Sequence, residues 1–431
     1  MIGDLVLDPP APVSTRPVSA VSGGVGVAGL AGMLAWLAVA FHYRMDGPYA
    51  ALVNVLACGI AMVGWSVLVD KVHRNPSTGI DWANPRPWRE TLDLSLTKLA
   101  GLWATWAGIG IVYGLGRFWW QGGYVFAMQC LGVAAPILFA LSIPYVIWLD
   151  RRLVSPKDGA WQLGAWLMNL DVEIDRQAIA HHLRAWSVKA FFLAFMLAIL
   201  PGGYAGLIRY DMGQVLTDPV RLAQFLITFM FVIDVGFATV GYILTMRPLD
   251  SHIRQANPLA AAWMAALICY PPFVLMGPGM PLDYHPGTHD EAGWLIWLAG
   301  HPLFQALIGA MLVVLTGIYA WATVAFGLRF SNLTHRGIVT HGPYAWSRHP
   351  AYLAKNSYWW LATLPMFSTG SMVDAARATG LMAIVAGVYY WRAKTEEAHL
   401  GTDPAYEAYW HWAEAHAPVP RFFRWLRGLA T

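Results

Sequence analysis

The stretch 341–352, HGPYAWSRHPAY, combines residue types that bind an anion. Arg348 and His349 stand directly before Pro350, and proline suits the first position of a helix because the N–H there has no partner anyway. The free N–H groups and the dipole of a helix start attract negative charge. The stretch therefore predicts a seat for a carboxylate or a phosphate. It fits equally well a structural turn with an arginine at the membrane edge.

A second ionisable group follows at Glu396 and Glu397, two adjacent carboxylates near the expected end of a helix. Carboxylates at that end oppose the helix dipole, which favours a positively charged partner. Arg392 lies four residues before Glu396, so a solvated ion pair would also explain the sequence. A ligand that carries a carboxylate and an ammonium would match both groups. S-adenosylmethionine is one such ligand, and its sulfonium also favours aromatic faces.

These residues lie in a chain that is 57% hydrophobic and 12% charged. Soluble domains contain about 25% charged residues, so the composition predicts an integral membrane protein. The net charge of +3 is too small and dispersed to indicate nucleic acid as a partner. Apolar runs near the roughly 20 residues that a span requires predict an all-α bundle of about ten transmembrane helices, at 21–41, 49–69, 94–115, 123–148, 187–208, 220–246, 259–278, 292–327, 351–368 and 372–391.

The cations predict how this bundle is oriented. Segments after the even-numbered spans are rich in Lys and Arg, whereas the other segments contain few. Because cations collect on the cytoplasmic side, we expect both termini and both ionisable groups there, brought together by the helical hairpin 351–391. We also expect the run 292–327 to be tilted, or broken near 301–302, and a helix at about 171–186 to lie on the membrane surface or to cap the bundle. An aromatic helix at about 404–416 suits the membrane interface.

Charged residues elsewhere offer two further candidate sites. Asp234 is the clearest charge inside a predicted span. A carboxylate at mid-helix costs on the order of 2.5–3.5 kcal/mol, so Asp234 would line a substrate cavity or bond to a neighbouring helix. Asp283, His285, His289 and Asp290 could ligate a metal, but their spacing matches no strong metal motif. We expect a solvated outer loop there and no metal site.

The two ionisable groups together resemble a known family. HGPYAWSRHPAY, followed by EEAHLGTDPAYEAYWHW and PVPRFF, resembles the C-terminal signature of the isoprenylcysteine carboxyl methyltransferase and phospholipid methyltransferase superfamily. The resemblance is confined to the C-terminal quarter of the chain. It implies S-adenosylmethionine bound on the cytosolic side and a lipid acceptor that comes from the bilayer. By position it implies that Gly342, Pro343 and Tyr344 shape the adenosine side of the cofactor site, and that Arg348, His349 and Tyr352 hold the polar end of the cofactor. Glu396 and Glu397 would meet its amino group or the acceptor. His341 and Pro350 complete the expected cofactor-binding residues.

The chain departs from the family pattern after R-H-P-A-Y, where the family usually has Gly and this chain reads Leu-Ala-Lys-Asn. We therefore place Lys355 and Asn356 with Asp234 as expected substrate contacts. Sterol C14- and C7-reductases share this C-terminal core but bind NADPH, whose 2′-phosphate would need cations such as Arg329 and Arg336. Their G-W-W is replaced here by G-P-Y, and the E-E pair favours the methyltransferase. A non-catalytic lipid-binding protein is the third alternative.

The residues and the resemblance together predict a membrane methyltransferase that acts on a lipid or lipidated, isoprenoid-type acceptor at the cytoplasmic face. Residues 1–20 would be a cytoplasmic segment, 21–328 would form the acceptor cavity, and 329–431 would be the catalytic region. The composition, rich in Arg, Ala, Gly and Trp, suggests a bacterial inner membrane. The transfer would rely on positioning and exclusion of water. The catalytic candidates are Arg348, His349, Glu396 and Glu397, of which the last three could act as a base for an amine or hydroxyl acceptor.

Overall fold

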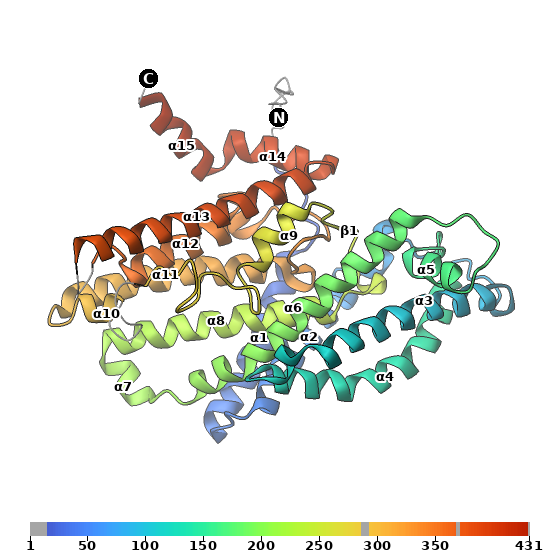
Figure 1. Ribbon diagram of the computed structural model, residues 1–431, viewed down its shortest axis with the longest axis horizontal. Coiled ribbons are helices and arrows are strands. Elements are labelled where there is room, and N and C mark those ends of the chain that lie inside the picture. The colour runs from blue at the N-terminus through green and yellow to red at the C-terminus, as the bar shows by residue number, and fades with distance from the viewer. Residues whose placement is uncertain (1–14, 286–292, 368–370, 430–431) are drawn as a thin grey trace.

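The computed structural model describes residues 15–285, 293–367 and 371–429, so His289 and Asp290 lie outside the described residues. Within those ranges the chain forms fifteen α-helices, shown in Figure 1. Seven of them are long and apolar enough to cross a membrane, which makes this a polytopic helical membrane protein. The seven spans are α1 (Gly23–Tyr43), α2 with its π-helical end (Pro48–Val69), α4 (Tyr124–Asp150), α6 (Arg176–Ile208), α8 (Pro219–Ile243), α11 with its 3-10 end (Pro302–Arg329) and α13 (Met372–Leu400).

Shorter or more polar elements connect these spans. They are α3 (Trp88–Leu115), α5 (Gly159–Leu167), α7 (Met212–Thr217), α9 (Ala260–Leu267), α10 (Trp294–Trp297), α12 (Pro350–Thr363), α14 (Pro404–His416), α15 (Pro418–Leu429), and the antiparallel strands β1 (Gln255–Ala256) and β2 (Thr334–His335). The predicted span 94–115 is thus helical within α3, whose first half carries several charges. Pro418 is the first residue of α15, a helix that the sequence analysis did not predict.

The predicted span 259–278 is wrong. Only α9 forms there, because prolines at 271 and 272 have no N–H for a helix and crowd the preceding turn. The chain nevertheless runs along the full length of α13. Asn257 Nδ2 donates to Thr395 O at 3.5 Å near the C-terminal end of α13, and Arg377 near its start donates to Asp283 O at 3.3 Å. This segment therefore covers the depth of a span without being a continuous helix.

Two other predicted boundaries changed, and one was confirmed. The predicted surface helix 171–186 and span 187–208 form one 33-residue helix, α6, whose start is capped by the Asp175 carboxylate. The predicted span 351–368 contains only the 14 residues of α12, about 21 Å of helix against a hydrocarbon core of about 30 Å. The break near 301–302 is confirmed, since α10 ends before it and α11 starts at Pro302.

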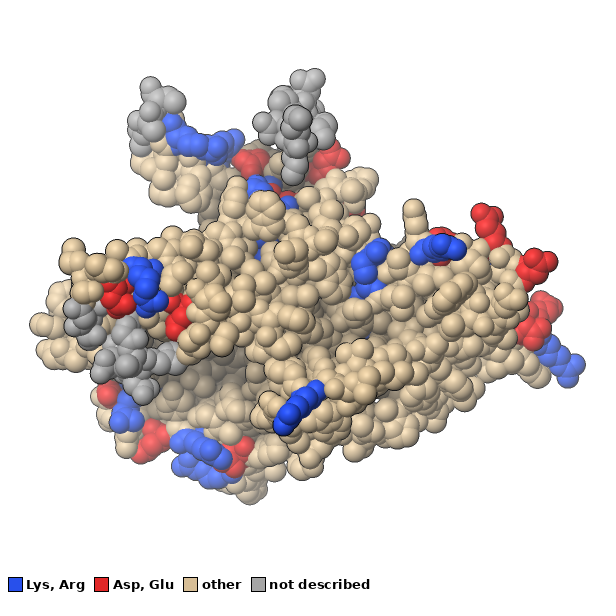
Figure 2. Space-filling model, viewed as in Figure 1, with Lys and Arg blue, Asp and Glu red and all other residues tan. Residues whose placement is uncertain are grey.

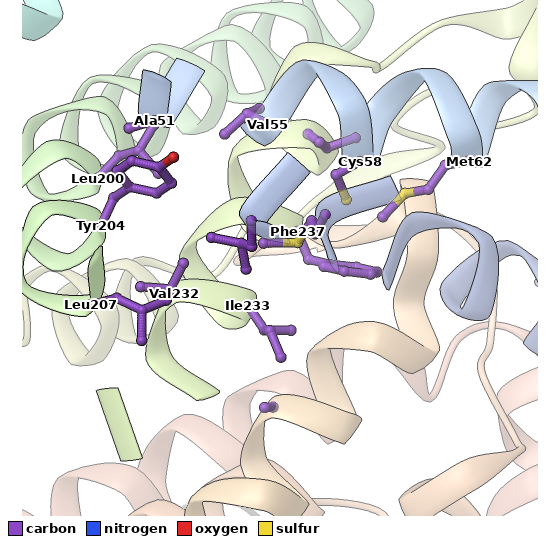
Figure 3. Close-up of a cluster of buried hydrophobic side chains, with 14 of the residues drawn as sticks. Ala51, Val55, Cys58, Met62, Leu200, Tyr204, Leu207, Val232, Ile233 and Phe237 are labelled. Atoms are coloured by element: carbon purple, nitrogen blue, oxygen red, sulfur yellow. The ribbon is translucent and has the colours of Figure 1, made fainter. Parts of the chain in front are cut away.

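The largest buried core joins α1, α2, α6 and α8. Figure 3 shows how three of these helices contribute side chains that point toward one another. The labelled residues are Ala51, Val55, Cys58 and Met62 from α2, Leu200, Tyr204 and Leu207 from α6, and Val232, Ile233 and Phe237 from α8. This core holds α8, which carries Asp234, in a fixed position relative to the N-terminal helices.

Helices α3 and α5 cross at two glycines. A Cβ on Gly101 would lie 2.0 Å from Ala160 O, and one on Gly164 would lie 1.8 Å from Thr97 O, so only glycine permits this close approach. A buried ion pair lies beside the crossing. Lys98 Nζ is 2.5 Å from Asp150 Oδ1 and 3.1 Å from Asp158 Oδ2.

Helices α11, α12 and α13 lie together on one side of the molecule, while α3, α4 and α5 lie on the other (Figure 1). The beginning of the described chain meets the C-terminal region, because Ala20 N donates to Ile338 O at 2.8 Å and Arg16 lies 6.0 Å from the Trp412 ring centroid. Both ends of the described chain therefore lie at the same end of the bundle. Figure 2 shows a broad face with few charged side chains, as expected of a surface in contact with lipid.

Candidate functional site

The turn before α12 consists of the 3-10 turn η8 (Gly342–Ala345) and a short link to Pro350. Gly342 has φ 61°, in the left-handed region, and a Cβ there would lie 3.1 Å from Trp321 Nε1, so both conformation and space require glycine. Pro350 is the first residue of α12, as the sequence predicts, with His349 immediately before it. The turn places Arg348 and His349 beside the C-terminal end of α13.

A cavity of about 140 Å³ opens beside this turn. Helices α8, α11, α12, α13 and α14 all contribute side chains to it, as does Tyr270 in the irregular segment that follows α9. Residues far apart in the sequence thus share one space. The residues that the sequence analysis proposed and that line this cavity are Asp234, Tyr344, Arg348, His349, Tyr352, Lys355 and Glu396.

An ionic cluster of Arg348, His349 and Glu397 lies at one edge of the cavity. Glu397 Oε1 is 3.1 Å from His349 Nε2 and 3.4 Å from Arg348 Nη2. Its Oε2 accepts a hydrogen bond from Lys394 Nζ at 2.9 Å, and Arg348 also lies 2.9 Å from Glu414 Oε1 on α14. The side chains of Arg348, His349 and Glu397 are 15%, 19% and 15% exposed, so the attraction between them is only partly screened by solvent.

The two adjacent glutamates have different surroundings. Glu396 lines the cavity, with Oε2 3.8 Å from His349 Nδ1. Glu397 binds the ionic cluster and does not line the cavity. The difference arises because neighbouring residues on a helix point about 100° apart. The solvated ion pair between Arg392 and Glu396 does not form among the described residues. Arg392 is buried and donates to Asn332 Oδ1 at 3.2 Å.

Aromatic rings form much of the cavity wall, and sequence reasoning missed several of them. The His349 ring stacks on Tyr352 with centroids 5.7 Å apart. The Arg392 guanidinium lies 5.8 Å, 5.2 Å and 5.1 Å from the ring centroids of Tyr270, Tyr352 and Tyr389. Arg392 lies directly after the last predicted span, 372–391, where an arginine is ordinary, and its spacing to Glu396 offered a simple explanation.

Helix α14 covers the cavity. Its predicted start is confirmed, because the Asp403 side chain accepts a hydrogen bond from Ala405 N and Pro404 is the first helical residue. The expectation that all its aromatic residues suit the membrane interface is wrong for Tyr406 and Tyr409, which are 4% and 2% exposed. Tyr409 Oη donates to Tyr344 O at 2.7 Å, which ties α14 to the turn. Burial raises the pKa of the Tyr409 phenol, so it remains a neutral donor.

At its inner end, the cavity holds a polar group contributed by α8, α11 and α12. Asp234 accepts hydrogen bonds from Tyr319 Oη at 3.0 Å and from Thr323 Oγ1 at 2.5 Å. Lys355 Nζ lies 5.5 Å from the Tyr319 ring centroid and 5.1 Å from that of Trp359. Within the described residues Lys355 has no carboxylate within 4 Å, so its ammonium faces ring faces and the cavity.

The other proposed site residues do not line the cavity. His341 Nδ1 lies 2.9 Å from Ser19 Oγ, which attaches the N-terminal segment to the turn. Asn356 Nδ2 donates to Tyr352 O at 2.8 Å, one turn back along α12. Gly342, Pro343 and Pro350 shape the backbone of the turn.

The cations considered for an NADPH phosphate are already bound within the protein. Arg329 Nη2 donates to Asp250 Oδ2 at 2.8 Å, and Arg329 Nη1 donates to Arg336 O at 2.6 Å. Arg336 is 2% exposed and donates to five backbone carbonyls, among them Ser251 O and Gly241 O. Burial lowers the pKa of Arg336 to about 9. The expectation that this pair is available to a phosphate is therefore wrong.

The charged and aromatic side chains that line the cavity fit S-adenosylmethionine. Arg348 and His349 match a carboxylate, Glu396 matches an ammonium, and the tyrosine faces match a sulfonium. Arg348 Nη1 and Tyr406 Oη are buried and have no hydrogen-bond partner within the described residues, so both could serve a ligand. Asp283 and His285, the described members of the outer-loop group, pair with each other at 2.8 Å.

The sequence model of the isoprenylcysteine carboxyl methyltransferase family matches residues 303–402. This confirms the resemblance seen in the C-terminal region, and it implies a domain that depends on S-adenosylmethionine. The match begins at the start of α11 and ends just after α13. Neither the curated proteins nor the solved structures that were compared include a match to the chain.

Proposed function

We propose that this protein transfers a methyl group from S-adenosylmethionine to a lipid or lipidated acceptor at the cytoplasmic face of a membrane. The observation that carries the proposal is the cavity between α12 and α13, which joins Arg348 and His349 from one helix start to Glu396 from the other helix. These residues lie within the family match. Ionisable residues in a membrane-embedded bundle are rare and often mark a substrate site.

The three residues of the ionic cluster and Glu396 then have distinct roles. Arg348 and His349 hold the carboxylate of the cofactor, and Glu396 holds its ammonium. Glu397 acts as a positioning residue, because its contacts of 3.1 Å to His349 and 3.4 Å to Arg348 fix both side chains. When bound, the cofactor supplies a methyl group activated on a sulfonium. The aromatic wall excludes water, which raises the strength of every electrostatic contact inside.

The inner polar group serves the acceptor. Lys355 on α12 and Asp234 on α8 both line the cavity, so they can contact the polar end of a lipid. A carboxylate acceptor would pair with Lys355 and needs no general base. An amine or hydroxyl acceptor must also lose a proton to a general base, and Glu396 can be that base only if it does not hold the ammonium of the cofactor.

The proposal also includes the orientation of the chain. Both termini would be cytoplasmic, at a bacterial inner membrane, with 21–328 supplying the acceptor cavity and 329–431 the catalytic region. The contact between Ala20 and Ile338 supports the placement of both ends on one side. Met196, Asp234 and Tyr270 line the cavity from outside 329–431, which supports a contribution of the upstream helices to the site.

The test is a thermal-shift titration of the detergent-solubilised protein with S-adenosylhomocysteine and, separately, with NADPH. A ligand at 100 times its Kd stabilises a protein by about 2.7 kcal/mol. A shift with S-adenosylhomocysteine alone supports the methyltransferase. A shift with NADPH alone would replace it with the reductase of a lipid double bond.

A further inference from the structure

A second hollow lies on the other side of α6, outside the family match. It measures about 550 Å³, within the range of about 300–1,000 Å³ for small-molecule sites. Helices α3, α5 and α6 and the segment 263–273 form it, and we call it the α3–α6 groove. Its walls are almost entirely apolar, with Trp186 and Phe191 from α6 facing Trp263 and Phe273.

The groove opens on the surface that the membrane covers. Val112 on α3 is 59% exposed and Phe273 is 52% exposed, and both line the groove. Its α6 wall belongs to one of the seven spans. Lipid chains, rather than water, are therefore the molecules that can enter it.

A chain of aromatic rings in contact leads from the wall of the groove to the wall of the cavity. Phe191 lines the groove and stacks on Phe273 with ring centroids 6.4 Å apart. The next residue on α6, Phe192, packs against Tyr270 with ring centroids 5.1 Å apart, and Tyr270 lines the cavity. Tyr270 and Phe273 lie only three residues apart, on the irregular segment after α9.

That irregular segment has a physical explanation if it lines a binding path. Non-helical backbone at membrane depth is tolerated only where it is buried in protein or lines a cavity. Here it separates two hollows and presents a ring to each of them.

From these observations we infer that the α3–α6 groove binds the hydrocarbon chain of the acceptor, and that the acceptor is a lipid with one long apolar chain and a small polar end. The inference rests on the proposed function. The chain would lie in the 550 Å³ groove, and the polar end would pass Tyr270 into the 140 Å³ cavity, toward Lys355 and Asp234. A groove of this volume with apolar walls suits one hydrocarbon chain rather than the two chains of a phospholipid.

Two glycines on α3 provide a matched pair of variants. A Cβ on Gly108, which lines the groove, or on Gly110, which does not, would meet no atom within 4 Å. Gly108→Trp should therefore start its side chain in open space and place the ring in the groove, and Gly110→Trp is the same change on another face of the helix. Both variants should keep the wild-type thermal shift with S-adenosylhomocysteine.

The full-length protein in nanodiscs is irradiated with hexadecanoic acid that carries a diazirine near its methyl end, and separately with a diazirine-tagged phosphatidylcholine. Labelled peptides are identified by mass spectrometry. We expect the single-chain probe to label the groove segments of α3 and 263–273 in the wild type. The yield of labelled groove peptides should be at least fivefold lower in Gly108→Trp and unchanged in Gly110→Trp. Equal labelling by the two-chain probe, or equal labelling in both variants, would overturn the inference. An absent shift with S-adenosylhomocysteine would instead count against the proposed function, whatever the labelling.

Discussion

Replacing His349 with Ala tests the cofactor site most directly. His349 Nε2 lies 3.1 Å from Glu397 Oε1, and its ring lies on Tyr352. Glu397 would retain Arg348 and Lys394, so the free energy of unfolding without ligand should fall by only about 1 kcal/mol. The protein should therefore fold, and any loss of ligand binding can be attributed to the site.

The expected loss of binding follows from the contact that His349 would make with a carboxylate. A hydrogen bond to a charged group is worth about 1.5–3 kcal/mol, which corresponds to a loss of about 10- to 150-fold in affinity. At a ligand concentration 100 times the wild-type Kd, a 100-fold loss reduces the stabilisation from about 2.7 to about 0.4 kcal/mol. The assay is the thermal shift with S-adenosylhomocysteine.

The matched control is His411→Ala. His411 lies on α14 outside the cavity, and its one ion-pair contact among the described residues is long, with Nε2 3.9 Å from Glu407 Oε1. It should show the wild-type shift. A full shift in His349→Ala would refute the assignment of His349 to the cofactor. Loss of the shift in both variants would mean that α14, not the imidazole of His349, controls binding.

Three other predictions follow from contacts outside the ionic cluster. Lys98→Met leaves Asp150 buried without its cation and should lower the free energy of unfolding by about 3–5 kcal/mol, seen as a lower Tm; an unchanged Tm would show that the pair contributes nothing. Burial raises the pKa of Asp250, but Arg329 and other donors outweigh it and hold the pKa below its ordinary value. Stability from Asp250 is thus present above about pH 4 and lost as the pH falls through the lowered pKa, so the Tm of Asp250→Asn should vary less with pH in that range than the wild type. Asp234→Asn should raise KM for the acceptor and leave the S-adenosylhomocysteine shift intact, and the opposite pattern would place Asp234 on the cofactor side.

Local sequence was sufficient wherever short-range chemistry controls the structure. Proline at 350 and at 404 predicted two helix starts, because its fixed φ and missing N–H suit the first position of a helix. Apolar length predicted most spans, because lipid gives the backbone no hydrogen-bond partners. The same rule failed at 259–278, where composition is apolar but two adjacent prolines prevent a helix.

The pairing of distant side chains could not be predicted in this way. Arg392 lies at helical spacing from Glu396, yet it is buried and bonded to Asn332, sixty positions away. Tyr409 belongs to an aromatic helix that suits a membrane surface, yet its hydroxyl fastens the turn at Tyr344. Which partner an arginine or a tyrosine finds depends on helix rotation and on which helices are neighbours.

The sequence by itself determined that this is a helical membrane protein with a cationic helix start and an acidic helix end in its C-terminal quarter. Only the tertiary structure decided that Glu396 faces the cavity while Glu397 supports it, and that Asp234 and Lys355 share its inner end. It alone linked an apolar groove to that cavity through the rings of Phe191, Phe192 and Tyr270. The physical reason is that helix propensity and hydropathy act over one turn or one span, whereas a site is made by packing several helices together, and packing depends on the shapes of all of them.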